Sequence, residues 1–238
     1  MTLDWQGAAQ SVIHHPLFGI GITLGAYQVV LAGYEKTRWT FLQPVLLSML
    51  LLIGVLTFCG ISYDEYRQST QILGTLLGPA TVALAVPLFL NLRRIRQLFW
   101  PVLTTLVVGG VFATGLCLAL GTWFGTDHMI LMTMAPKSVT SPIAMLVAQQ
   151  IGGVAALAAV FVLITGVIGG IFGPALLNRV GVRHAAARGM ALGLTAHAVG
   201  TSVALQESEE TGAFAALAMS LMGVGTAVFL PLAVSLSV

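Results

Sequence analysis

Long apolar stretches separated by short groups of charged residues make up most of this chain of 238 residues. The main charged groups lie at 35–38, 64–67, 93–96, 179–188 and 207–210. The intervals between them are mostly about 20 residues or longer, the length at which a helix crosses the ~30 Å hydrocarbon core of a bilayer. The pattern therefore predicts an all-α membrane helix bundle with about seven spanning helices. They are expected at 16–34, 41–60, 70–91, 98–122, 154–177, 187–205 and 212–236.

The interval from His128 to Asn178 does not fit a simple crossing. It holds 51 residues and one charged side chain, Lys137. The pair Gly152-Gly153 divides it into two helical parts. Either both parts cross the membrane, or 128–152 forms a re-entrant hairpin and only the second part crosses.

The distribution of basic residues favours the hairpin. Loops at 35–38, 93–96 and 179–188 hold eight of the ten basic residues and one of the eight acidic ones, as expected for the cytoplasmic side. For the loops at 93–96 and 179–188 to lie on the same side of the membrane, the segment 128–178 must cross it an odd number of times. The hairpin at 128–152 is therefore predicted, with the N-terminus outside, the C-terminus in the cytoplasm and the glutamates at 207–210 opposite the arginines.

Composition agrees with a protein that lies in lipid along almost its whole length. Hydrophobic residues make up 57% and charged residues 8%, whereas soluble domains are about a quarter charged. We expect one transmembrane domain over 1–238. The net charge of +2 gives no sign of a nucleic-acid surface. Cys59 and Cys117 lie in apolar stretches without metal-ligand spacing, so no cofactor or metal is expected. Motifs of intramembrane proteases are also absent from the sequence, and we expect no enzyme activity.

Three polar stretches with proline or glycine interrupt the apolar pattern, at 78–81, 135–142 and 195–202. Proline removes a backbone donor and interrupts a helix. Backbone groups freed at membrane depth are tolerated only where protein or a wet cavity satisfies them, and transporters place anion sites at such breaks. The stretches therefore predict a substrate-binding site for a small anion. Its candidate residues are Gly78, Thr81, Lys137, Ser138, Thr140, Ser141, His197, Gly200 and Thr201.

Lys137 and His197 carry the chemistry of this predicted site. A charge inside an apolar interval costs at least ~2.5–3.5 kcal/mol on insertion scales, so Lys137 is interpreted as the counter-charge of a carboxylate. The alternative is a lysine that reaches the interface from a shallow turn. His197 could bind substrate, carry a proton or brace a helix break. The alternative is a core histidine satisfied by a backbone carbonyl.

Four motifs, in this order and spacing, resemble the LrgB/CidB family, which includes bacterial inner-membrane proteins and the C-terminal part of the plastid glycolate/glycerate translocator. They are ISYDEY at 61–66, LLGPATVAL at 76–84, PKSVTSPIA at 136–144 and AHAVGT at 196–201. Ser141 stands where many members look to have threonine, which keeps the hydroxyl. The resemblance covers the chain from about Pro16 onward.

This resemblance implies transport of small carboxylates such as glycolate, glycerate or pyruvate. It also implies a role in murein hydrolase export or control, with a small holin-like LrgA/CidA partner. We therefore expect a secondary transporter of small organic anions in the inner membrane, and a homodimer is a further hypothesis. The alternative is a holin-like pore or regulator of cell lysis.

Overall fold

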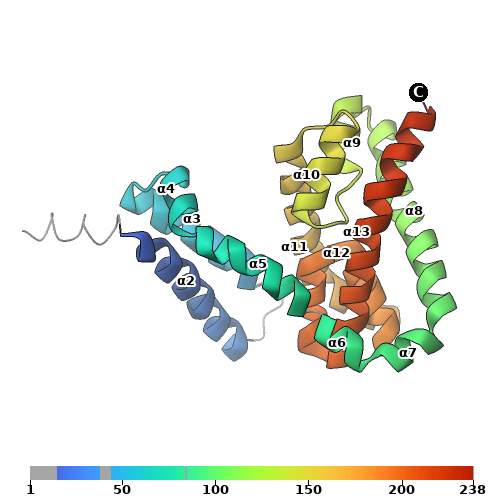
Figure 1. The fold of residues 1–238 in the computed structure, drawn as a ribbon, viewed down its shortest axis with the longest axis horizontal. Helices are drawn as coiled ribbons and strands as arrows, with labels where there is room; N and C mark the ends of the chain where they lie inside the picture. The colour runs from blue at the N-terminus through green and yellow to red at the C-terminus, as the bar shows by residue number, and fades with distance from the viewer. Residues whose placement is uncertain (1–14, 38–43, 84, 238) are drawn as a thin grey trace, which may run out of the picture. The chain divides into compact units, whose positions relative to one another are not determined.

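The computed structural model of the chain describes residues 15–37, 44–83 and 85–237 (Figure 1). Every regular element in these ranges is a helix, which confirms the predicted all-α class. The helices form two compact units, 1–83 and 84–238, which we call unit 1 and unit 2. Arg38, part of the predicted basic loop, lies outside the described residues.

Four helices make up the described part of unit 1. They are α2 (Pro16–Thr37), α3 (Pro44–Cys59), α4 (Tyr63–Ser69) and α5 (Gln71–Ala83). α2 contacts both α3 and α4, and the hydroxyls of Thr23 and Tyr66 are 2.9 Å apart. α4 begins with a capping box, in which the side chains of Ser62 and Glu65 each accept the other's backbone N–H. The sharp bend of 115° between α3 and α4 follows from this new helix start.

Eight helices make up the described part of unit 2. They are α6 (Ala85–Leu90), α7 (Leu92–Gln97), α8 (Phe99–Trp123), α9 (His128–Met134), α10 (Ser141–Gln150), α11 (Ala155–Arg179), α12 (Ala185–Glu207) and α13 (Glu209–Ser237). The main buried cluster draws on α8, α10, α11, α12 and α13, with Val162 and Phe214 among its members. Glycines let backbones approach closely, since a Cβ on Gly193 would overlap Ala215 of α13.

α9 and α10 form a helical hairpin, which we call the first hairpin. Leu131 of α9 and Val147 of α10 share one buried cluster with Ile151. The Thr133 hydroxyl accepts a hydrogen bond of 2.9 Å from the Val154 N–H, at the start of α11. The chain therefore turns at 135–140 and returns to the end of unit 2 from which it came (Figure 1). A hairpin lies where the sequence predicts one, at 128–152.

α12 also doubles back on itself, and we call it the second hairpin. Its backbone leaves the helical region at His197, with φ 41° and ψ −124°. Arg188 and Glu207, 19 residues apart, would be separated by ~28 Å along a straight helix, yet their side chains meet at 2.6 Å. Gly200 lies against the carbonyl of Leu192. The prediction that 187–205 spans the membrane is therefore wrong, whereas the interruption predicted at 195–202 is observed at His197.

The two hairpins start from opposite ends of α11. This helix has 25 residues, and its ends are therefore separated by ~37 Å. α9 reaches ~10 Å inward from one end, and residues 185–196 reach ~18 Å from the other. The turn at 135–140 and the break at His197 therefore approach each other inside unit 2.

The structure has fewer spanning candidates than the sequence predicts. Four described helices are long and apolar enough to cross a membrane, and the bent pair α3–α4 makes a fifth if it counts as one span. The predicted span at 70–91 is divided between α5 and α6. Length and mean hydropathy alone did not distinguish a crossing from a hairpin or a broken helix. The four candidates are Leu17–Thr37, Phe99–Trp123, Ala155–Arg179 and Glu209–Leu236.

Two ion pairs correct the predicted distribution of charge. Arg94 Nε lies 3.4 Å from Glu210 Oε1, and Arg188 binds Glu207. The glutamates at 207–210 therefore lie on the same end of unit 2 as the arginines of α7 and of the α11–α12 connection, which we call the arginine face. α13 then carries the C-terminus to the opposite end (Figure 1). The prediction that the C-terminus shares the arginine face is wrong, because the second hairpin adds no crossing.

Candidate functional site

The turn of the first hairpin lies buried inside unit 2 and carries Lys137. The Asp127 side chain accepts the Met129 N–H at 2.8 Å and starts α9, and residues 135–140 are not α-helical. Ser138 is 4% exposed and Val139 1% exposed. The turn is therefore packed inside the protein, and the choice between a counter-charge and an interfacial lysine stays with the proposal below.

Lys137 has few polar partners in this position. It is half-buried, and its Nζ donates to Ser138 Oγ over 3.4 Å. No acidic side chain of the described residues forms an ion pair with it. A half-buried ammonium with one long neutral hydrogen bond keeps donors available for an anion.

The break of the second hairpin is centred on His197, a buried residue with strained backbone. It is 3% exposed, and no other described non-glycine residue has positive φ. Such a conformation costs of order 1–3 kcal/mol and persists only where the surroundings hold it. The Thr201 hydroxyl helps to hold it by donating to the His197 carbonyl at 2.8 Å.

The ring of His197 is satisfied on one side only. Its Nε2 lies 2.9 Å from the carbonyl oxygen of Val162 on α11, as the core-histidine interpretation expects. Its Nδ1 is buried and has no hydrogen-bond partner among the described residues. A buried polar atom without a partner is rare in proteins and points to an absent ligand or water.

The structure brings the two breaks together. Val139 of the first turn, Leu194 of α12 and Val162 of α11 share one buried cluster. The N-termini of α10 and of the second half of α12 both lie at these breaks, where helix dipoles favour an anion. The arrangement can therefore attract a small anion from two directions.

The other candidate residues divide into three groups. Thr140 and Ser141 lie half-buried at the start of α10, and the Thr140 side chain makes no capping bond. Gly200 and Thr201 close the second hairpin. Gly78 and Thr81 belong to α5 in unit 1, where their side-chain surroundings lie outside the described structure.

The predicted interruption at 78–81 is not observed, because α5 continues through Pro79 to Ala83. A proline inside a helix removes one hydrogen bond without necessarily ending the helix. The prediction was wrong because it interpreted Pro79 as the end of a helix.

The base of the second hairpin was not predicted as a functional feature. Arg188 binds both carboxylate oxygens of Glu207, at 2.6 and 2.7 Å. It also donates to Asn178 Oδ1 at 2.8 Å and to the Val182 carbonyl at 2.9 Å. The hydrogen bond with Glu207 raises the pKa of the Arg188 guanidinium, which keeps the guanidinium charged at physiological pH. The sequence does contain a signal for this feature, because Arg188 and Glu207 are opposite charges at the two ends of one apolar interval.

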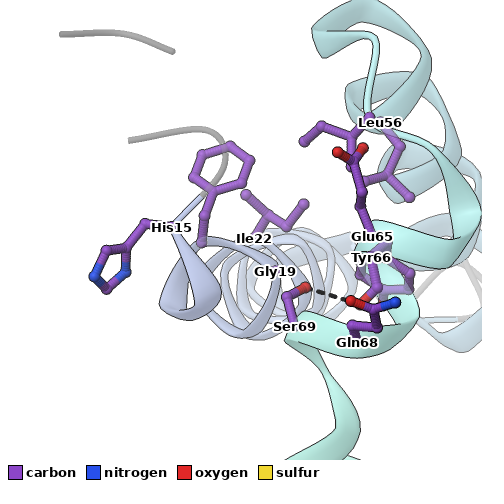
Figure 2. A pocket seen from close by; sticks show the side chains of 10 residues that line it. His15, Gly19, Ile22, Leu56, Glu65, Tyr66, Gln68 and Ser69 are labelled. Atoms are coloured by element: carbon purple, nitrogen blue, oxygen red, sulfur yellow. Dashed lines mark hydrogen bonds between the residues drawn. The ribbon is translucent and has the colours of Figure 1, made fainter. Parts of the chain in front are cut away.

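Unit 1 contains a separate cavity of about 230 Å³. Figure 2 shows Glu65, Tyr66, Gln68 and Ser69 of α4 on the side of the cavity opposite Gly19 and Ile22 of α2. Ser69 comes so close to Gly19 that a Cβ there would overlap its hydroxyl. None of the nine candidate residues lines this cavity. No group of three or more His, Cys, Asp or Glu side chains suited to a metal occurs in the described part of the chain.

Comparisons with known proteins point to one family. A model of the LrgB-like family matches residues 23–236. The Bacillus subtilis (strain 168) protein YxaC is 36% identical over 213 residues, covering 90% of this chain and 93% of YxaC. The antiholin-like protein LrgB of Bacillus mycoides (strain KBAB4) is 30% identical over 218 residues, covering 91% of this chain and 95% of that protein. No solved structure matches the chain.

Proposed function

The chain belongs to the LrgB-like family, and from the geometry of unit 2 we propose that it transports small organic anions across the membrane. The observation that carries the proposal is Lys137, an ammonium on the buried turn of one hairpin. Val139 of this turn packs in one buried cluster with Leu194, which lies three residues before the break of the opposite hairpin. The site would bind an anion of a few heavy atoms, and glycolate, glycerate and pyruvate are the candidates that the family resemblance suggests.

Each group at the site has a role in this proposal. Lys137 would pair with the carboxylate, and the start of α10 with Ser138, Thr140 and Ser141 would add hydrogen bonds. The helix N-terminus at the second break would contribute partial positive charge. A charge-assisted hydrogen bond contributes about 1.5–3 kcal/mol, so losing the Lys137 pair is expected to weaken the apparent affinity at least ~10-fold.

The opposed hairpins also suit alternating access. In the membrane we interpret both as re-entrant, with α8, α11 and α13 crossing. Each hairpin would then separate the site from one side, and a shift of either hairpin would expose it to that side. Sites between broken helices of opposite orientation are common in secondary transporters.

The arginine face supports one orientation of unit 2 in the membrane. In unit 2 this face carries six arginines against three glutamates, and the positive-inside rule assigns it to the cytoplasm. The C-terminus would then be outside. With Cys59 and Cys117 replaced by serine, a membrane-impermeant thiol reagent added to cells should label Ser235→Cys and leave Arg183→Cys unlabelled. The reverse pattern would invert the assignment.

A second candidate function is regulation of cell lysis. The printed name of the Bacillus mycoides relative, antiholin-like protein LrgB, favours this function more directly than it favours carboxylate transport. In that case the protein would act with a small holin-like LrgA/CidA partner, whereas a transporter would act alone or as a homodimer. Lysis regulation predicts partner-dependent, non-saturable leak of solutes.

Flux into proteoliposomes separates the two functions. Purified protein should take up labelled glycolate, glycerate or pyruvate with saturation. Lys137→Ala should lose most of this flux, and Lys137→Arg should retain part of it. Lys36→Ala, which removes the other lysine at an exposed position of α2, is the matched control and should match wild type. Equal flux through wild type and Lys137→Ala would refute the site. Non-saturable leak that appears only when an LrgA/CidA partner is added to the proteoliposomes would favour lysis regulation.

A further inference from the structure

α11 provides the immediate surroundings of the His197 ring. The carbonyl oxygen of Val162 lies 2.9 Å from Nε2. One turn further along α11, a Cβ added to Gly166 would lie 2.6 Å from Cε1 and 2.9 Å from Nε2 of the same ring. The ring therefore lies directly over the backbone of Gly166, and a side chain at this position would displace it.

These contacts determine where the ring carries its proton. A carbonyl oxygen only accepts hydrogen bonds, so the Nε2 that faces Val162 must be the protonated nitrogen. In the neutral ring, Nδ1 is then an acceptor. A doubly protonated ring would place a charge on a side chain that is 3% exposed, and burial disfavours the charged form.

The acceptor atom lies at the candidate site. Nδ1 is buried and unpartnered among the described residues, on the hairpin break whose surroundings include the first turn. Lys137 offers only donors, and the site would therefore combine a donor of positive charge with a neutral acceptor. This pairing suits an anion that brings its own O–H, or an anion bound together with a water molecule.

We infer that Val162 and Gly166 are positioning residues that hold His197 as the Nε2–H tautomer, so that Nδ1 accepts a hydrogen bond at the anion site. The inference builds on the proposed function, since it assigns a role at the same site. It concerns Gly166, which does not touch the anion and acts only through the ring.

The tautomer can be measured without any transport. Solid-state NMR of protein labelled with ¹⁵N-histidine, in lipid bilayers, distinguishes protonated from unprotonated ring nitrogens. Subtracting the spectrum of His197→Asn identifies the signals of His197 among the five histidines. We expect one protonated nitrogen, Nε2, and one unprotonated nitrogen, Nδ1. A protonated Nδ1, in either the other tautomer or the charged ring, would overturn the inference even if transport is observed.

Glycine variants test the positioning role. Gly166→Ala should change the His197 signals and raise KM for the transported anion at least ~10-fold, with a smaller change in kcat. Gly173→Ala lies on the same helix and meets only the end of the Leu192 side chain, and Gly115→Ala on α8 meets no atom within 4 Å. Both should keep the wild-type spectrum and KM. If Gly166→Ala keeps them too, the positioning role is refuted.

Two ligands identify the donor that Nδ1 accepts. Glycolate carries a hydroxyl next to its carboxylate, and acetate has the same carboxylate without it. A shift of the Nδ1 signal with glycolate alone would identify the anion's own hydroxyl, and a shift with both would identify a shared water. No shift with either ligand, in protein that binds them, would refute an acceptor role for Nδ1. If wild type binds and transports neither, the proposed function fails while the tautomer measurement still stands.

Discussion

The two hairpins of unit 2 reach the same site by different local structures. The first turns over six residues, 135–140, between a helix end and a new helix start with Pro142 in its first turn. The second turns at one residue, His197, whose backbone adopts a conformation that few residues other than glycine accept. The first break is encoded in residue types that disfavour helix, whereas the second depends on tertiary contacts that hold a strained residue.

The polar interactions that hold the hairpins differ in the same way. The first hairpin is tied to α11 by a neutral hydrogen bond between Thr133, near the end of α9, and Val154. The second is closed by the charged pair of Arg188 and Glu207. A hairpin held by strain needs stronger ties than one formed by its own sequence, and the following four predictions test this difference from the largest expected effect to the smallest.

Gly200→Ala should have the largest effect, because the new Cβ would overlap the Leu192 carbonyl inside the second hairpin. Backbone cannot move aside as a side-chain end can. We expect a loss of ~3 kcal/mol or more in stability, measured by thermal unfolding in detergent. Gly225→Ala on α13, with no atom within 4 Å, is the control. Equal stability of the two variants would mean that the second hairpin can open without cost.

Arg188→Met should come next. The change leaves Glu207 without its bidentate partner and removes hydrogen bonds to Asn178 and Val182. The Arg188 side chain is 12% exposed and that of Glu207 24%, so solvent replaces the pair only in part. We expect a loss of ~2 kcal/mol. In a double-mutant cycle with Glu207→Gln, additive losses would show that the pair does not close the hairpin.

Thr133→Val should have a smaller effect on the first hairpin. Valine keeps the size of threonine but leaves the Val154 N–H without its acceptor. An unsatisfied buried donor costs about 1–3 kcal/mol, and this one is only part-buried, so we expect ~1 kcal/mol. Thr133→Ser, which keeps the hydroxyl, is the control. A loss of stability larger than that of Arg188→Met would contradict the prediction that the second hairpin is held by the stronger interaction.

Pro142→Ala should have the smallest effect. A proline in the first turn of a helix has no lost hydrogen bond to restore, and its contribution is mainly a restricted unfolded chain. We expect a loss below ~1 kcal/mol and unchanged transport. Loss of transport with stability retained would show that Pro142 shapes the site itself.

Much of unit 2 was predictable from the sequence. The prediction failed at 187–205, and this error misplaced the residues that follow in the chain. The crossing helices α8, α11 and α13 follow from apolar length, and the first hairpin follows from the requirement for an odd number of crossings. The same counting then failed at 187–205, because an apolar interval of spanning length can also hold two shorter helices. One missed hairpin moves every later residue to the other face, which is why Glu207 and the C-terminus were misplaced.

The candidate site was predictable only as far as residue types reveal chemistry. Lys137 stands out because a charge in an apolar interval is costly, and His197 because it lies among glycines. The carbonyl of Val162 and the missing side chain of Gly166 cannot be recognised from residue type, since every residue has a carbonyl and glycine is common in membrane helices. Their roles depend on which helix faces the ring, and only the fold determines that.

The close backbone contact between α12 and α13 has a mechanical consequence. Gly189 and Gly193 meet the backbone at Thr211 and Ala215 directly, so the second hairpin and the start of α13 would move as one stiff block. The first hairpin meets α13 through side chains. These include the end of Ile143 at Gly223 and the cluster that Leu230 and Val234 join, and such contacts yield with rotamer changes. Sliding of the first hairpin is therefore expected to need less force than sliding of the second.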